Sequence, residues 1–170
     1  MHVITHLLLS ILISIVISLK YDVSLIGFLT GILSGTLLDL DHLYNYVRYH
    51  GTPTSIREII QEMTNSYKQP PDSAVRYHTM AHELVGMFFF AIVSILVGYF
   101  YSLVYAFLIF LPVLGHFVLD ALSVRMMFFS PFSGREFFIG LLKPNSLQEK
   151  LIIIILATTI TSLVVLKALN

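Results

Sequence analysis

Residues 84–119, with the sequence LVGMFFFAIVSILVGYFYSLVYAFLIFLPVLGHFVL, contain no Asp, Glu, Lys or Arg. As one α-helix this segment would be about 54 Å long, whereas the hydrocarbon core of a bilayer is about 30 Å thick. The segment must therefore fold back on itself. Residues 98–102 offer the turn, because the flexible Gly98 is followed there by aromatic residues that favour the membrane interface. We predict two membrane spans, at about 79–98 and 102–122, with the second kinked at Pro112.

Three further apolar segments extend this architecture. Residues 2–19 and 23–40 predict a helical hairpin around the turn at 20–22, and residues 151–167 predict a fifth span. The whole chain is 56% hydrophobic and 12% charged, whereas soluble domains are about 45–50% apolar and 25% charged. The sequence therefore predicts an all-α, polytopic membrane helix bundle of about five short transmembrane helices. We expect residues 1–170 to form a single membrane-embedded domain.

The longest connection, between the second and third spans, contains a further helical pattern. Ser55 and Glu58 have the spacing of a capping box, and apolar residues then recur at helical intervals up to the prolines at 70 and 71. We predict an amphipathic interfacial helix at about 55–69. We favour a helix that lies among the lipid headgroups over a lid that covers a site. Residues 123–142 form an apolar, aromatic connection, for which a re-entrant path is one option.

The composition also limits the chemistry. The chain has no cysteine, so any metal ion must be held by nitrogen and oxygen ligands. Its formal net charge of zero gives no reason to expect nucleic-acid binding. No basic stretch precedes the first apolar segment, and no small-residue cleavage site follows it. We therefore interpret this segment as a retained helix rather than a signal peptide.

Basic residues divide unevenly between the two sides of a five-span topology. The N-terminus and the connections at 41–78 and 123–150 share one side, which we call the loop side. That side holds Arg48, Arg57, Lys68, Arg76, Arg125, Arg135, Lys143 and Lys150, and the other side holds Lys20 and Lys167. By the positive-inside rule the loop side is cytoplasmic, so we expect a multi-pass protein of the inner (cytoplasmic) membrane.

The ionisable residues of the spans gather at this same loop side. The helix ends that meet there carry His6, Asp39, Asp41, His42, His78, His82, Glu83, His116 and Asp120. Ionisable residues in or beside membrane helices are costly, so by default they face the bundle interior and mark a functional site. Imidazole nitrogen with carboxylate oxygen is the ligand set expected for zinc, manganese or iron. The sequence therefore predicts a divalent metal ion, with zinc preferred, at the loop side.

Local spacing adds detail to this prediction. His78 and His82 are four residues apart, as are His116 and Asp120, so the members of each pair share one helix face and can converge on one ion. Any one such pair, taken alone, is as well explained by a structural contact between buried helices. Convergence of four helices is what favours a metal site.

The sequence leaves open which aspartate at the end of the second span lines the site. Asp39 and His42 share a helix face, whereas Asp39 and Asp41 are about 200° apart if the helix continues through them. Both aspartates can line the site only if the helix ends near Leu40, and one of them could instead orient a ligating histidine. His6, taken alone, is more typical of a structural residue than of a ligand.

Carboxylates beside a metal ion suggest activation of water, because the ion lowers the pKa of bound water towards about 7 and a neighbouring carboxylate can accept the proton. We take Glu83 and Asp41 as the candidate catalytic groups. For Glu83 the roles of general base, metal ligand and salt-bridge partner all stay open.

These residues carry a resemblance to a known family. The shared features, in order, are an early histidine at His6, the motif Asp39-Leu40-Asp41-His42, the two-histidine run from His78 to His82, Gly115-His116 followed by Asp120, and Pro131-Phe132. On these motifs the chain resembles the YdjM-like, LexA-regulated proteins described as predicted membrane-bound metal-dependent hydrolases. The likeness covers nearly the whole chain. Leu38 and Glu83 stand where that family commonly has proline and serine.

A more distant likeness extends the expectation. The order His, Asp, His-x-x-x-Asp is similar to that of helical zinc phospholipases C and zinc-dependent single-strand nucleases. This likeness implies a zinc phosphoesterase, with His6, Asp39, His42, His78, His82, His116 and Asp120 as candidate metal ligands. It also implies that Arg76 or Arg125 could hold the phosphate of a lipid or lipid-linked substrate.

The leading prediction is a membrane-bound metal-dependent hydrolase that acts on a phosphoester at the membrane interface, with metal-bound water as the nucleophile. A second hypothesis is a divalent-metal transporter or sensor, because histidines and carboxylates in membrane helices also mark ion pathways. A third is a non-enzymatic stress-response membrane protein whose polar cluster is structural. Ligands at one end of the spans favour the hydrolase, since transporters bind near the bilayer midplane.

Overall fold

The computed structural model describes residues 3–40, 44, 47, 55, 83–123, 126, 129, 132–135, 137–143 and 146–169. Within them the chain forms α1 (Val3–Lys20), α2 (Leu25–Thr36), the 3-10 turn η1 (Leu37–Asp39), α5 (Leu84–Phe100), α6 (Leu103–Ser123) and α7 (Leu147–Leu169). The predicted all-α bundle is confirmed. The predicted interfacial helix at 55–69 lies, apart from Ser55, outside the described residues.

Three of these helices have the length and composition of membrane spans. They are α1, α6 and α7, with mean hydropathies of 2.2, 2.0 and 2.4. The pair α2–η1 and helix α5 are shorter apolar helices. With 17 residues, α5 is about 26 Å long, which is close to the thickness of a bilayer core. Each of the five predicted apolar segments contains a helix among its described residues.

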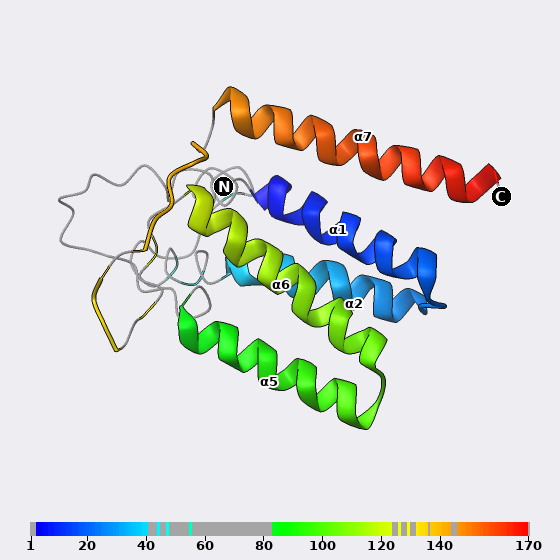
Figure 1. Ribbon diagram of the computed structural model, residues 1–170, viewed down its shortest axis with the longest axis horizontal. Helices are drawn as coiled ribbons and strands as arrows, with labels where there is room; N and C mark the ends of the chain where they lie inside the picture. The colour runs from blue at the N-terminus through cyan, green and yellow to red at the C-terminus, as the bar shows by residue number, and fades with distance from the viewer. Residues whose placement is uncertain are drawn as a thin grey trace.

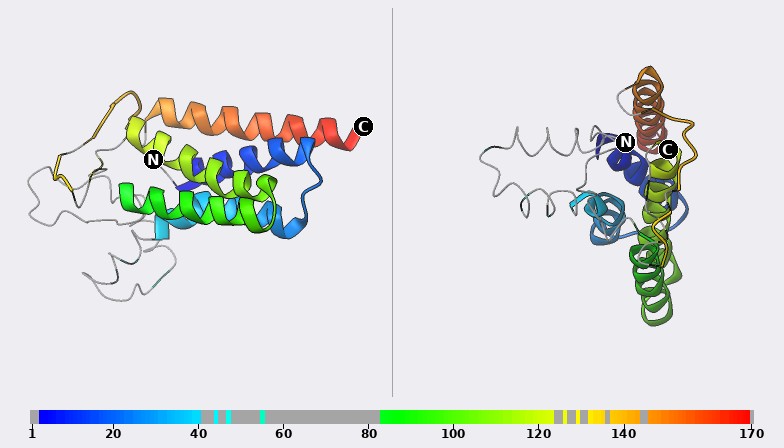
Figure 2. Two further views of the ribbon diagram at one scale, coloured as in Figure 1. Left: turned by 60° about the horizontal axis from the view of Figure 1, so that its bottom comes forward. Right: turned by 90° about the vertical axis from the view of Figure 1, so that its left-hand side faces the viewer.

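Of the described helices, three form a trio at the centre of the bundle, and two pack on its outside. Helices α1, α2 and α6 pack against one another, α5 packs on α6, and α7 packs on α1 (Figures 1 and 2). The chain directions alternate, so the first residues of α1, α5 and α7 meet the last residues of α2 and α6 at one end of the bundle (Figure 1). We call this end the site end and the opposite end the turn end.

Glycines on α2 allow close approach within the trio. Gly27, Gly31 and Gly35 follow one another at intervals of one turn and face α1 and α6. A Cβ atom on Gly31 would lie 3.1 Å from Leu108 Cδ2, and one on Gly35 would lie 2.9 Å from Pro112 Cβ. In lipid, such small residues let helix backbones come together, since there is no hydrophobic drive between membrane helices. The glycine positions therefore set how closely α2 and α6 pack.

Helix α7 is held at its first turn. The Thr5 hydroxyl of α1 donates to Glu149 Oε1 at 3.1 Å, and Glu149 is only 1% exposed. The Ser146 hydroxyl accepts from the Glu149 backbone N–H at 3.4 Å and so caps the helix. Helix α7 therefore starts at Leu147, earlier than the span predicted from residue 151. The reason is that Glu149 is buried against α1, although its charge suggested a residue in water.

An apolar core lies beside the site end of the trio. Leu38, Val113, Phe117 and Met126 are buried together, and Met87 packs against them. Leu38 directly precedes Asp39, and Phe117 directly follows His116. These buried neighbours fix the backbone directly before Asp39 and directly after His116.

Candidate metal centre

Four polar side chains from three parts of the bundle are buried at the site end. They are His6 of α1, Asp39 of η1, and His116 and Asp120 of α6, each exposed by 2% or less. Burial of two carboxylates with two imidazoles in a membrane helix bundle is costly unless the groups satisfy one another or an ion. Their convergence is therefore the strongest candidate for a functional site among the described residues.

Asp120 lies between the two histidines. Its Oδ1 atom is 3.2 Å from His6 Nε2, and its Oδ2 atom is 3.2 Å from His116 Nε2. His116 Nε2 is also 3.7 Å from Asp39 Oδ1. The Nε2 atom of His116 thus faces carboxylates from two separate elements.

A backbone contact fixes which nitrogen of His116 carries a proton. His116 Nδ1 lies 2.6 Å from the carbonyl oxygen of Gly35. A carbonyl only accepts hydrogen bonds, so Nδ1 is the donor, and in the neutral ring Nε2 holds the lone pair. That lone pair points towards carboxylate oxygens of Asp39 and Asp120. The Nε2 lone pair and the carboxylate oxygens repel one another. A cation between them, either a proton or a metal ion, attracts both.

The two imidazole rings lie face to face. The ring centroids of His6 and His116 are 3.7 Å apart, and the planes differ by 17°. Neither ring nitrogen of His6 makes a hydrogen bond within the described part of the chain. Its one polar contact among these residues is that of Nε2 with Asp120, and burial of a ring so poorly satisfied costs free energy, so His6 offers a nitrogen suited to an ion.

The geometry fits a small divalent ion. His6, Asp39 and His116 each offer one ligand atom, and these atoms all lie within 4.8 Å of one another. Neighbouring ligands on a tetrahedral zinc ion are about 3.3–3.6 Å apart, since each lies about 2.0–2.2 Å from the metal. The His116 distances of 3.2 Å to Asp120 and 3.7 Å to Asp39 lie close to that range. The cluster can hold a metal ion.

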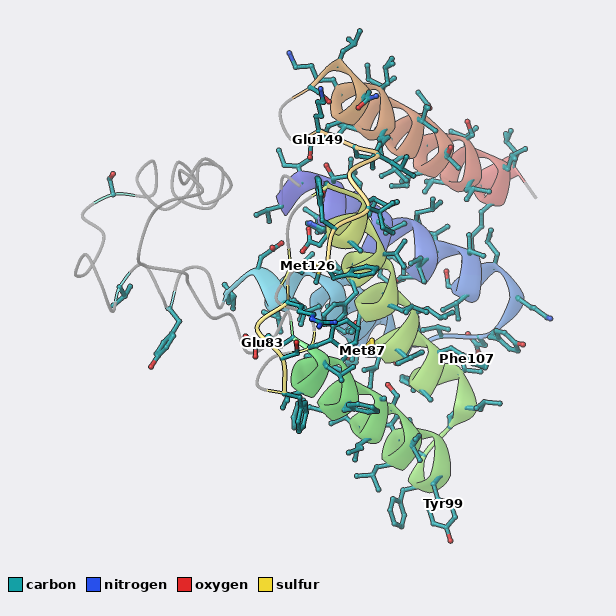
Figure 3. All side chains as sticks on the ribbon, turned by 60° about the vertical axis from the view of Figure 1, so that its left-hand side comes forward. Glu83, Met87, Tyr99, Phe107, Met126 and Glu149 are labelled. Atoms are coloured by element: carbon teal, nitrogen blue, oxygen red, sulfur yellow. The ribbon has the colours of Figure 1, made fainter. Side chains whose placement is uncertain are left out.

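Of the predicted site residues, the structure brings together His6, Asp39, His116 and Asp120. Glu83 is 6% exposed and stands at the start of α5, at the site end together with Glu149 (Figure 3). The other predicted site residues lie outside the described part of the chain: Asp41, His42, Arg76, His78, His82 and Arg125. They remain predictions.

Two contributors were missed by the sequence analysis. The first is the Gly35 carbonyl, for which no residue pattern could give a signal, because every helix end presents carbonyl groups. The second is the Thr5–Glu149 contact beside the cluster. The Ser146–Glu149 capping spacing was a usable signal for the position of Glu149, but not for its burial.

Comparison with known proteins agrees with a membrane protein. The chain matches the YdjM inner membrane protein family over residues 1–168. No curated protein and no solved structure matches the chain. Because the family match covers nearly all of the sequence, the chain belongs to the YdjM inner membrane protein family.

Proposed function

We propose that this protein is a membrane-bound, metal-dependent hydrolase that acts on a phosphoester of a membrane lipid or lipid-linked molecule. The observation that carries the proposal is the buried cluster of two histidines and two aspartates, drawn from α1, η1 and α6. Zinc is the preferred ion, and manganese and iron are accepted by the same donors.

The roles of the described residues follow from their contacts. His6, Asp39, His116 and Asp120 would hold the ion, and the Gly35 carbonyl keeps His116 Nε2 turned towards it. A divalent ion there supplies Lewis-acid activation of water and of a phosphoryl oxygen. Glu83 and Asp41 are the proposed proton acceptors, and Arg76 and Arg125 the proposed phosphate contacts.

The depth of the cluster supports hydrolysis over transport. His6 lies three residues inside α1, and His116 lies seven residues from the end of α6. At 1.5 Å per residue these positions are about 5 and 10 Å from the helix ends, on the site side of the midplane. Transporter sites are typical of the midplane, with access from both sides. We infer that a phosphate headgroup would approach the site from the leaflet at the site end.

The first prediction concerns turnover. Purified, detergent-solubilised protein should hydrolyse at least one member of a panel of phospholipids, lipid phosphates and generic phosphodiesters when zinc or manganese is present. Asp120→Ala should abolish this turnover, because the carboxylate contacts both histidines. Glu83→Gln should lower the rate by about 10² to 10⁴ and spare metal binding, if Glu83 accepts the proton.

Ser123→Ala is the matched control. Ser123 is buried one turn from Asp120, but its hydroxyl bonds the Leu119 carbonyl of its own helix, so turnover should be unchanged. No hydrolysis above the Asp120→Ala blank, together with saturable zinc flux into proteoliposomes that Asp120→Ala removes, would replace the hydrolase with a transporter.

A further inference from the structure

The connection between α6 and α7 exposes more apolar side chains than a water-facing loop tolerates. We call its described residues, 126, 129, 132–135 and 137–143, the aromatic connection. Its exposed large apolar side chains are Phe129 (44%), Phe132 (81%), Phe137 (40%), Phe138 (47%), Ile139 (50%) and Leu141 (65%). Contiguous exposed apolar side chains of this kind mark an interaction surface rather than ordinary scatter.

This connection is folded and tied to the end of α6. Met126 and Phe137 exchange backbone hydrogen bonds of 3.0 and 2.7 Å. The backbone N–H groups of Ile139 and Leu142 donate at 2.9 Å to the carbonyls of Ala121 and Leu122 respectively, in the last turn of α6. These bonds satisfy carbonyls that a helix end leaves without partners. The exposed aromatic side chains are therefore displayed by a fixed backbone.

The backbone limits how deep this surface can lie. Non-helical backbone facing lipid is excluded from the hydrocarbon core, because its N–H and C=O groups find no partners there. Apolar side chains, in contrast, gain by leaving water. Both conditions hold only at the boundary between headgroups and acyl chains, where the backbone stays among the headgroups and the phenyl rings reach inward. Phe132 lies within the turn in which Ser133 N–H donates to the Phe129 carbonyl, and it is the most exposed ring among the described residues of the aromatic connection.

The position of the aromatic connection in the bundle agrees with a depth at the membrane interface. The aromatic connection leaves the end of α6 and leads along the site end of the bundle to the first turn of α7 (Figures 1 and 3). The two helices that it joins also expose apolar residues, Val118 on α6 and Leu147 and Leu151 on α7. Lipid that covers those helices can therefore cover the connection too.

The charge of the segment indicates which lipids it prefers. Arg135 and Lys143 are exposed within the aromatic connection. Between the two helices, residues 124–146 contain Arg125, Arg135 and Lys143 against the single acid Glu136, so the segment is net positive. Basic residues beside interfacial aromatic residues attract anionic phospholipid headgroups.

We propose that the aromatic connection is an interfacial anchor that binds anionic phospholipids of the leaflet at the site end, with Phe132 as its deepest residue. This inference does not depend on a metal ion or on hydrolysis. The anchor holds the end of α6 at the boundary between headgroups and acyl chains, with Asp120 about 5 Å and His116 about 10 Å further along the helix.

The test uses the absence of cysteine from the chain. Phe132→Cys, in the full protein, is spin-labelled and reconstituted into vesicles of equal parts phosphatidylcholine and phosphatidylglycerol. Collision with oxygen should exceed collision with a water-soluble nickel chelate. Ile155→Cys, exposed in the middle of α7, gives the hydrocarbon reference, and Asp22→Cys, exposed in the turn between α1 and α2, gives the water reference. A Phe132→Cys label that meets the nickel chelate as readily as the Asp22→Cys label overturns the anchor.

Lipid preference is tested on the same position. A fluorophore attached in Phe132→Cys should be quenched at least about twofold more by brominated phosphatidylglycerol than by brominated phosphatidylcholine. Arg135→Gln with Lys143→Gln should remove that difference, whereas the control Lys20→Gln with Lys167→Gln, at the turn end, should keep it. Equal quenching by both lipids in the otherwise unaltered chain overturns the anionic preference. Quenching that rises as the protein is diluted in the same brominated lipid shows that a second copy, and not lipid, covers the surface of the undiluted protein.

Discussion

The residue at the centre of the cluster is His116, because it is fixed from two opposite sides. The Gly35 carbonyl holds Nδ1 at 2.6 Å, and the carboxylates of Asp39 and Asp120 face Nε2 at 3.7 and 3.2 Å. Such a contact on the second nitrogen sets ring orientation and raises the basicity of a ligating histidine. Gly35 therefore acts as a positioning residue through its backbone.

This role gives a prediction at Gly35. A Cβ there meets the Ser10 hydroxyl and lies 2.9 Å from Pro112 Cβ, so Gly35→Ala should move α2 away from α6 and lengthen the bond to His116. Zinc affinity, measured by chelator competition, should fall about 10- to 100-fold.

Gly31→Ala supplies the comparison. Its Cβ would crowd Ser14 Oγ at 2.5 Å and Leu108 Cδ2 at 3.1 Å, one turn further from the cluster, and the nearest atoms that it meets do not belong to the cluster. Gly31→Ala should lower thermal stability in detergent and leave zinc affinity within about threefold of the unaltered protein. If both substitutions weaken zinc binding equally, the Gly35 carbonyl has no special part in the site.

Residue identity predicted much of the described cluster. The four-residue spacing of His116 and Asp120 places them on one helix face, and the cost of charge in lipid turns that face inward. His6 looked structural when taken alone, yet its ring stacks on His116. Its contribution depends on the packing of α1 against α6, which no local pattern encodes.

At the scale of the element, hydropathy predicted which segments become helices and did so for a clear reason. Backbone polar groups in lipid must bond within the segment, so an apolar run of sufficient length has to be helical. Helix ends were harder to predict. Helix α2 gives way to a 3-10 turn at Leu37–Asp39, and α7 starts before its charged residues, of which Glu149 contacts Thr5 of α1.

The order of the helices around the bundle could not be predicted. Hydropathy predicts that a segment is buried in lipid, but it does not predict which helices pack against one another. The Gly27–Gly31–Gly35 spacing is the one sequence feature that indicates a close interface, and α2 does pack through it on α6. The position of α7 on α1 rests on the Thr5–Glu149 contact, which links residues from opposite ends of the chain.

At the scale of the whole molecule, the alternating helices give the bundle two different ends. The site end collects the described buried acids and histidines, and the basic residues of the connections favour the cytoplasm for that end. Gln148 at the site end and Asp22 at the turn end are both exposed.

These two positions test the orientation in intact cells. A membrane-impermeant thiol reagent should label Asp22→Cys and should reach Gln148→Cys only after the cells are opened, with the cysteine-free parent as the blank. The opposite labelling pattern would place the site end outside the cytoplasm.

The central claim is that His6, Asp39, His116 and Asp120 form a metal centre, and elemental analysis tests it most directly. Protein is purified gently, washed with chelator, reloaded with zinc, manganese or iron, and freed of unbound ions before its metal content is measured. We expect stoichiometric metal in the unaltered chain and in Ser123→Ala, and loss of that metal in His116→Ala and His6→Ala while circular dichroism shows intact helices. A chain that carries no stoichiometric metal on purification, and takes up none on reloading, would contradict the claim and leave the cluster a structural one.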